Sequence, residues 1–230
     1  MTLHYVNDPV TGMSGLRPFK GSARKITVHT TETSVKPNWQ QQRTGLPHYT
    51  LAENTAYSHI PLDMAAYTMA GGANSPNSDA GVHIQIEWVG YSQDTPTRSD
   101  LDYSALSELI DDISKKIGCP WVFPFRFVGS QEGLSGAVRQ SWESYAPASG
   151  IMGHVHAPYT TTRWDPGILD TERLMFLRPP EPDVVDYDRI AEMVDAQIED
   201  EELLNVLLRV ERKVDDLSRK LGNLRLVVDN

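Results

Sequence analysis

The sequence predicts an α/β fold: a mixed central β-sheet flanked by helices, with a C-terminal helical extension that can form a coiled coil. Short β-rich segments alternate with one long amphipathic helical segment, as in a mixed α/β domain. Residues 177–183, LRPPEPD, cannot continue a helix. The last fifty residues carry 14 acidic and 7 basic side chains, so their charge differs from that of the preceding chain. We therefore expect a folded domain over 1–176, a linker over 177–185 and a helical oligomerisation segment over 186–230.

The composition excludes several kinds of partner. The 230 residues are 40% hydrophobic and 23% charged, which is enough apolar material for a packed core. A formal net charge of −10 provides no basic surface for nucleic acid and no polybasic membrane anchor. No stretch reaches the roughly 18 apolar residues of a membrane-spanning helix. The sequence thus predicts neither nucleic acid nor membrane as a partner.

Compartment is indicated by the cysteine content and the N-terminus. Cys119 is the only cysteine, so no intrachain disulfide can form and a reducing compartment is allowed. The first residues, MTLHYVNDPVTGM, lack the charged and then apolar pattern of a signal peptide. We expect synthesis in a cytoplasm.

Four segments have the composition of β-strands. KITVH (25–29) follows 23 residues whose Gly, Pro and polar content predicts a loop. A polar connection with room for a helix leads to two strands, 48–52 and 56–62. The fourth, VHIQIEWVG (82–90), alternates strictly and predicts one apolar and one polar face. The apolar face holds Val82, Ile84, Ile86 and Trp88, and the polar face holds His83, Gln85 and Glu87.

One helix has clear start and stop signals. Ser99 can cap its first turn and Gly118 can end it. A second helix is predicted over residues 135–146. The long helix is amphipathic, because its apolar residues recur at helical spacing: Leu106, Ile110, Ile113 and Ile117.

The C-terminal segment carries a heptad pattern, because its apolar residues are spaced alternately by four and three. Such a stripe packs either on its own domain or on a second copy of the chain. The proline-containing linker argues against tight packing on the domain, so we expect a homodimer. The stripe consists of Leu203, Leu207, Val210, Val214, Leu217, Leu221 and Leu224.

Candidate metal ligands follow the predicted strands. His29 ends the first strand, His154 follows the apolar pair Ile151 and Met152, and Asp165 precedes a proline. A catalytic zinc site needs three ligands of this kind and one open position. By spacing alone, ordinary hydrogen-bonding roles for these side chains are the commoner outcome.

Four motifs in order resemble those of the zinc-dependent N-acetylmuramoyl-L-alanine amidases, the group that includes phage lysozyme-type amidases and peptidoglycan recognition proteins. ITVHTTE is similar to the first zinc strand of that family, and PHYTLA with AYSHIPL to the strand pair that follows. VHIQIEWVG is similar to its IGIE strand, and GHVHAPYTTTRWDPG to its glycine-histidine segment. The resemblance covers roughly residues 24 to 172 and is strongest to amidase domains of phage endolysins.

The resemblance implies one zinc ion per chain, held by His29, His154 and Asp165. His154 matches the family's ligand because it follows the glycine, whereas His156 occupies a variable position. Zinc in such a site lowers the pKa of a bound water to about 7. Glu87 matches the family's catalytic glutamate.

Three positions depart from the family pattern. Arg163 stands where the family often has lysine; it can stabilise an anion but is a poor proton donor. Pro47 replaces a tyrosine that some phage members use. His48 either lines the substrate site or packs under the sheet. AAYTMAGG replaces the family's AWHAG, so a substrate-contacting histidine is missing there.

The implied activity is hydrolysis of the amide between N-acetylmuramic acid and L-alanine in peptidoglycan, by an endolysin that acts on the wall after release from the host cytoplasm. Two alternatives remain at this point. One is a non-catalytic peptidoglycan-binding module of the same fold. The other is a zinc peptidase acting on the stem peptide, although the His-Glu-x-x-His signature is absent.

Overall fold

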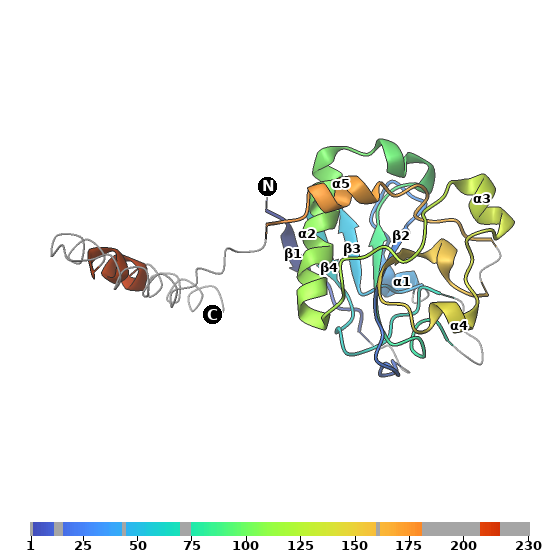
Figure 1. Cartoon of the computed structure of the whole chain (residues 1–230), viewed down its shortest axis with the longest axis horizontal. Helices are drawn as coiled ribbons and strands as arrows, with labels where there is room; N and C mark the ends of the chain where they lie inside the picture. Colours follow the sequence, from blue (N-terminus) through green and yellow to red (C-terminus); the bar gives the residue numbers. More distant parts are fainter. Residues whose placement is uncertain are drawn as a thin grey trace, which may run out of the picture. The chain divides into compact units, whose positions relative to one another are not determined.

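The computed structural model describes residues 2–11, 16–42, 45–69, 75–159, 162–180 and 208–216. The chain divides into two compact units, 1–179 and 180–230. The first unit is built on one six-stranded sheet, which Figure 1 shows beside the helix α2. Its strands are β1 (His4–Asn7), β2 (Arg24–Thr30), β3 (Tyr49–Ala52), β4 (Thr55–Ser58), β5 (Val82–Trp88) and β6 (Gly150–Gly153).

The sheet is mixed, and its central part is parallel. The strand order is β1-β4-β3-β5-β2-β6, and β3 with β4 is the antiparallel pair. The strands β3, β5, β2 and β6 run in one direction, so their carboxyl ends meet at one edge. Binding sites in parallel sheets form at such an edge. The predicted α/β class, with a mixed central sheet flanked by helices, is confirmed.

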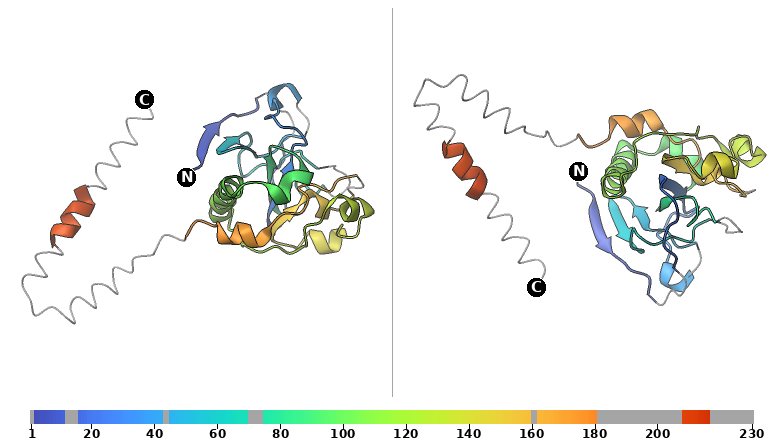
Figure 2. Two further views of the ribbon diagram at one scale, coloured as in Figure 1. Left: turned by 90° about the horizontal axis from the view of Figure 1, so that it is seen from above. Right: turned by 60° about the horizontal axis from the view of Figure 1, so that its bottom comes forward.

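One face of the sheet packs against α2 (Asp100–Ile117) and forms the main core. The helix begins as predicted: Ser99 and Asp102 form a reciprocal capping box that satisfies two amides of the first turn. It ends at Gly118, whose φ of 68° is left-handed and therefore suits glycine. The short helix α5 (Thr171–Phe176) packs beside α2 (Figure 2).

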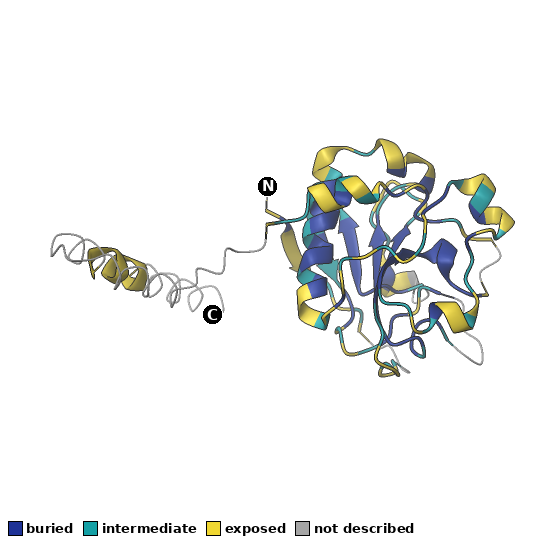
Figure 3. Cartoon of the chain, viewed as in Figure 1, coloured by how far each residue is buried: buried dark blue, intermediate teal, exposed yellow. Residues whose placement is uncertain are grey.

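The opposite face of the sheet is polar but also buried, as the dark central strands of Figure 3 show. Lys25, Thr27 and His29 alternate along β2, and His83, Gln85 and Glu87 along β5. Loops cover these side chains and satisfy them. The Lys25 ammonium donates to the carbonyls of Ala80 and Ala146, and Thr27 bonds the His83 ring. The strict alternation of β5 therefore separates an apolar core from an internal polar layer, and that layer leads to the carboxyl edge.

Several predicted boundaries are wrong. The first 23 residues were expected to be a loop, but His4–Asn7 forms β1, which pairs in parallel with β4 at the sheet's edge. The expected strand over 56–62 ends at Ser58. The polar connection does contain a helix, α1 (Trp39–Gln42).

The helix predicted over 135–146 is also wrong. Two short helices take its place, α3 (Ser130–Ser135) and α4 (Trp142–Tyr145). Gly136 ends the first with a φ of 79°, and Ser141 caps the second by accepting from the Ser144 amide. The left-handed Gly136 ends one helix and the N-cap Ser141 begins another, so the segment does not form a single helix. Two 3-10 turns complete the unit, η1 (Ser92–Thr97) and η2 (His154–His156).

The start of the predicted linker is tied to the first unit. Arg178 donates to the Asp111 carboxylate at 2.9 Å and stacks over the Trp121 ring at 5.0 Å. These contacts hold the chain against the domain up to the end of the first compact unit at Pro179. Residues 181–185 of the predicted linker lie outside the described residues.

In the C-terminal unit, residues 208–216 are helical. Val210 and Val214, two positions of the heptad stripe, are exposed on that helix. The other five stripe positions lie outside the described residues, so the homodimer stays a prediction. Among the described residues, no helix combines the length and apolar character needed to cross a bilayer.

Candidate metal centre and its cavity

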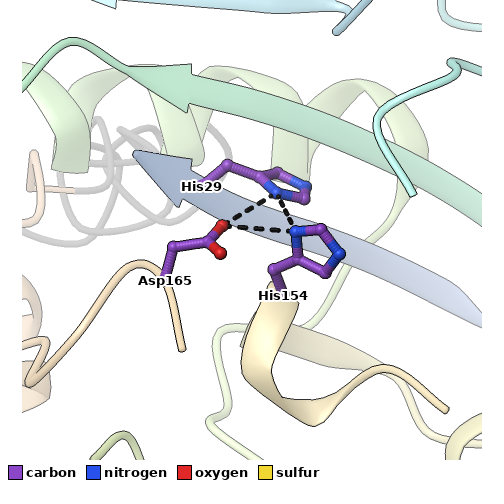
Figure 4. A group of neighbouring side chains, drawn as sticks. All are labelled: His29, His154 and Asp165. Carbon is purple, nitrogen blue, oxygen red and sulfur yellow. Dashed lines mark hydrogen bonds and ion pairs between the residues drawn. The ribbon is translucent and has the colours of Figure 1, made fainter. Parts of the chain in front are cut away.

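Three side chains from separate segments converge at the carboxyl edge of the sheet. His29 lies near the end of β2, His154 directly follows β6, and Asp165 lies eleven residues beyond His154. All three are buried, with at most 4% of each residue exposed. The Nδ1 atoms of the two histidines are 3.1 Å apart, and Asp165 Oδ2 lies 3.2 Å from that of His29 and 3.3 Å from that of His154. Figure 4 shows the three groups facing one point.

The local sequence explains why His154 and Asp165 meet. A Cβ atom on Gly153 would lie 2.5 Å from the Pro166 ring and 3.0 Å from the Phe127 ring, so only glycine allows this approach. The Val155 amide then donates to the Asp165 carbonyl at 3.1 Å. The Gly-His and Asp-Pro pairs of the sequence are therefore two sides of one close contact.

The triangle of donor atoms fits a tetrahedral zinc ion. Two ligands at zinc's usual 2.0–2.1 Å stand about 3.3 to 3.4 Å apart when the geometry is tetrahedral. The three separations here, 3.1, 3.2 and 3.3 Å, match that edge closely. Two neutral histidines and one carboxylate are also a donor set that zinc accepts in catalytic sites. Within the described residues, this is the group of His, Cys, Asp and Glu side chains whose geometry fits an ion.

The electrostatics favour the metal-binding forms of His29 and Asp165. Burial lowers the pKa of His29, although the hydrogen bond to Asp165 opposes the change, so its ring stays neutral. Burial alone would raise the pKa of Asp165, but its electrostatic interactions and hydrogen bonds with His154 and His29 outweigh the burial and hold the pKa below its usual range. A neutral ring and an ionised carboxylate are the forms that bind a metal.

Glu87 lies beside this centre. It is the register partner of His29 across the parallel pair β2–β5, so the two side chains stand on the same face of adjacent strands. Burial raises the pKa of Glu87 well above its usual value, and the nearby Asp165 charge raises it further, whereas Arg163 lowers it. Within the described residues, its carboxylate makes no hydrogen bond or ion pair. A buried, uncommitted carboxyl group beside a metal site is suited to proton transfer.

A cavity of about 500 Å³ opens over the centre. The exposed Arg163 reaches it from the segment before Asp165. Hydroxyl-bearing and aromatic residues make up much of the remaining wall. The lining residues are His29, Thr30, Thr31, Thr33, Pro37, Trp39, Gly45, Tyr67, Thr68, Met69, Glu87, His154, Arg163 and Asp165.

His156 does not reach the cavity. Its Nδ1 accepts from the Gly153 amide at 3.0 Å, and its Nε2 lies 2.9 Å from the Arg126 carbonyl. The ring also packs on Phe127 and is fully buried. Burial lowers the pKa of His156 to about 4, so the ring stays neutral and serves the packing of η2.

His48, expected either at the substrate site or under the sheet, is fully buried and does not line the cavity. Its Nδ1 accepts from the Gln85 amide at 3.0 Å and its Nε2 lies 2.8 Å from the Met64 carbonyl. Burial lowers the pKa of His48 to about 4. With both ring nitrogens used by the backbone and no part in the cavity wall, the structure does not bring His48 to the candidate site.

Several residues of the cavity wall had no role in the sequence analysis. Tyr67 and Thr68 lie in AAYTMAGG, the segment that departs from the family's pattern. Their residue types do not indicate a site, but their position could have done so, because the family's AWHAG motif at this place contains a substrate-contacting histidine. Tyr67, Thr68 and Met69 of this segment border the cavity.

Comparisons with known proteins give fold likenesses. No protein-family model matches the sequence, and a search of curated proteins found no match. Among solved structures, the Ph2119 endolysin from a Thermus scotoductus bacteriophage is 17% identical, with 73% of this chain and 92% of that one covered and a TM-score of 0.44. The structure of PlyL is 11% identical, with 79% and 100% covered and a TM-score of 0.46.

A third similar structure is the Staphylococcus aureus hydrolase AmiA. It is 11% identical to this chain, with 74% of this chain and 73% of that one covered and a TM-score of 0.42. Such likenesses concern the chain's arrangement alone.

Proposed function

We propose that this protein is a zinc-dependent N-acetylmuramoyl-L-alanine amidase that acts on peptidoglycan, as phage endolysins do. One observation carries the proposal. His29, His154 and Asp165 form a buried triangle of zinc dimensions, and Glu87 and Arg163 border the same cavity. The family resemblance of the sequence motifs selects the substrate from the many amides that such a site could hydrolyse.

The donor set defines what a metal would do here. A zinc ion bound by two neutral histidines and one carboxylate keeps a positive charge, lowers the pKa of a water molecule and polarises a carbonyl oxygen. The protein holds the three ligand side chains in fixed positions and buries them away from solvent. The carboxyl edge of β2 and β6 fixes His29 and His154, and the Val155–Asp165 hydrogen bond fixes the third ligand.

Glu87 supplies the proton transfer. Amide hydrolysis requires a base to take a proton from the attacking water and an acid to protonate the departing amine. The raised pKa of Glu87 allows one carboxyl group to do both in turn, because it binds the proton well and can then release it to a more basic amine. Arg163 cannot serve as that acid, since its guanidinium does not give up a proton near neutral pH.

Arg163 supplies a fixed positive charge to the anion that develops on the amide oxygen. We expect Arg163→Ala to lower kcat on the order of 10²-fold, the usual cost of losing one such donor. Arg163→Lys should keep most of the activity, because lysine also carries the charge. Rates measured on purified cell walls test this pair. An inactive lysine variant would show that the planar guanidinium makes a further contact.

The cavity wall suits a glycopeptide. The Thr33 and Thr68 hydroxyls can bond sugar hydroxyls or peptide groups, and Trp39 and Tyr67 add aromatic rings to the wall. The hydroxyls of Thr30 and Thr31 are instead hydrogen-bonded within the protein. The three metal ligands and the Glu87 carboxylate, which makes no hydrogen bond within the described residues, argue against a purely binding module. Such a module requires neither a metal ion nor a group for proton transfer. The acidic chain is repelled by anionic wall polymers, so wall contact must come from this cavity or from avidity through the predicted dimer.

Metal removal tests the proposed function as a whole. Purified walls should lose turbidity when the protein is added, should resist the chelator-treated protein, and should dissolve again once zinc is restored. A binding module would leave the turbidity unchanged throughout. Full activity of the metal-stripped protein would exclude a zinc hydrolase.

A further inference from the structure

Behind the metal centre lies a chain of two side-chain amides that ends on the backbone. The His29 Nε2 atom, which faces away from the centre, lies 3.1 Å from Gln85 Oε1. Gln85 Nε2 donates to Asn77 Oδ1 at 2.9 Å. Asn77 in turn pairs with both backbone groups of Met69. All three side chains are buried, so water does not compete with these bonds.

The backbone of Met69 fixes the direction of the whole chain of bonds. Its carbonyl can only accept, so it takes Asn77 Nδ2–H at 2.8 Å, and its amide can only donate, so it bonds Asn77 Oδ1 at 3.2 Å. Asn77 Oδ1 therefore faces Gln85 as an acceptor, and Gln85 must present its NH₂ group there. The Gln85 oxygen is then the atom left for His29.

An oxygen facing Nε2 requires a proton on that nitrogen. Since a neutral imidazole carries one proton, Nδ1 of His29 then has an unprotonated lone pair. Nδ1 is the atom that faces His154 and Asp165. The Thr68 hydroxyl, 3.4 Å from Nε2, can donate or accept and so does not select a tautomer. In metal-free protein the Asp165 carboxylate, 3.2 Å from Nδ1, favours a proton on that nitrogen instead. The two amides oppose it, because they present an acceptor and no donor to Nε2.

We propose that Gln85 and Asn77 are positioning residues that set the Nε2–H tautomer of His29 and thereby prepare its Nδ1 for the metal. The inference rests on the proposed zinc site. It assigns Asn77 a function at the centre although it contacts none of the three ligands. It also couples the ligand to the cavity wall, because Thr68 and Met69 line the cavity and Asn77 holds the Met69 backbone.

The test measures the His29 tautomer in metal-free protein by ¹⁵N NMR of the ring nitrogens, together with zinc affinity by chelator competition. We expect the unmodified protein to show Nε2–H. Gln85→Leu removes the acceptor, so both tautomers should appear and zinc should bind 10- to 100-fold more weakly, the usual effect of losing such a partner.

Asn77→Ala is the sharper variant, because it leaves every atom that touches His29 in place. Without Asn77, the Gln85 amide can turn and present either end to the ring, so the tautomer should again become mixed. Asn77→Asp keeps an acceptor toward Gln85 and should restore the Nε2–H form even if the protein melts at a lower temperature. A merely structural role for Asn77 would change the melting temperature but not the ring spectrum.

Gln140→Leu is the matched control. Gln140 is half-buried rather than buried, but its side-chain amide is likewise hydrogen-bonded, to the Val138 carbonyl and the Ser144 hydroxyl, and it does not line the cavity. It should change neither the tautomer nor the affinity. A pure Nε2–H form in both Gln85→Leu and Asn77→Ala would overturn the proposal. Because the tautomer is read without metal or substrate, this result is independent of whether the protein proves to be an amidase.

Discussion

His154→Ala should abolish zinc binding and wall hydrolysis, whereas His156→Ala should keep the metal. The two histidines are separated by one residue, but only His154 turns a ring nitrogen toward His29 and Asp165. Removing it leaves two ligands, which is fewer than the three protein ligands of catalytic zinc sites. Zinc content measured by mass spectrometry after desalting, with rates on purified walls, tests the prediction.

His156→Ala should instead cost stability. The substitution leaves the Gly153 amide and the Arg126 carbonyl without their partner, which costs about 1–3 kcal/mol for each buried group that finds no replacement. We expect a lower melting temperature with about one zinc per folded chain, in accord with the three-ligand set. Zinc lost from the His156 variant and kept in the His154 variant would show that the ligand is the other histidine.

Glu87→Gln should keep the zinc and the fold but lower kcat by 10²-fold or more, the usual contribution of a general base. Glutamine has the shape of glutamate and no basic oxygen of comparable strength. Because Glu87 makes no hydrogen bond within the described residues, its replacement disturbs no structural contact there. The rate, the zinc content and the melting temperature should therefore change independently, with only the rate falling.

Glu32→Gln provides the matched control for a nearby carboxylate. Glu32 Oε1 accepts from Thr30 Oγ1 and from the Ser92 amide, and glutamine keeps an oxygen for both. Glu32 does not line the cavity, so this variant should retain most of the activity. Near-normal hydrolysis by Glu87→Gln would remove Glu87 from the mechanism.

Periodicity predicted the parts of the fold where a single pattern dominates. The alternation in residues 82–90 gave both faces of β5, and the caps Ser99 and Gly118 gave both ends of α2. The strand β1 was missed because all four of its residues are exposed, so no apolar alternation marks it. Its pairing with β4 is a long-range contact that local composition does not encode.

The candidate site was predicted by motif order rather than by spacing. His29 and Asp165 are separated by 136 positions, and only the topology of β2 and β6 brings them together. The choice between His154 and His156 followed from the preceding glycine, which the structure explains by the close approach of Pro166. The Asn77–Gln85 chain could not be predicted, because it depends on how a loop folds over the polar face of the sheet.

Mass spectrometry of digested peptidoglycan distinguishes an amidase from the alternatives. An N-acetylmuramoyl-L-alanine amidase should release soluble peptides that begin with a free L-alanine amine and leave glycan strands that carry unsubstituted N-acetylmuramic acid. Neither product should form with Glu87→Gln or with metal-stripped protein. Fragments cut within the stem peptide, with the muramoyl–alanine amide intact, would exclude the proposed amidase and indicate a zinc peptidase.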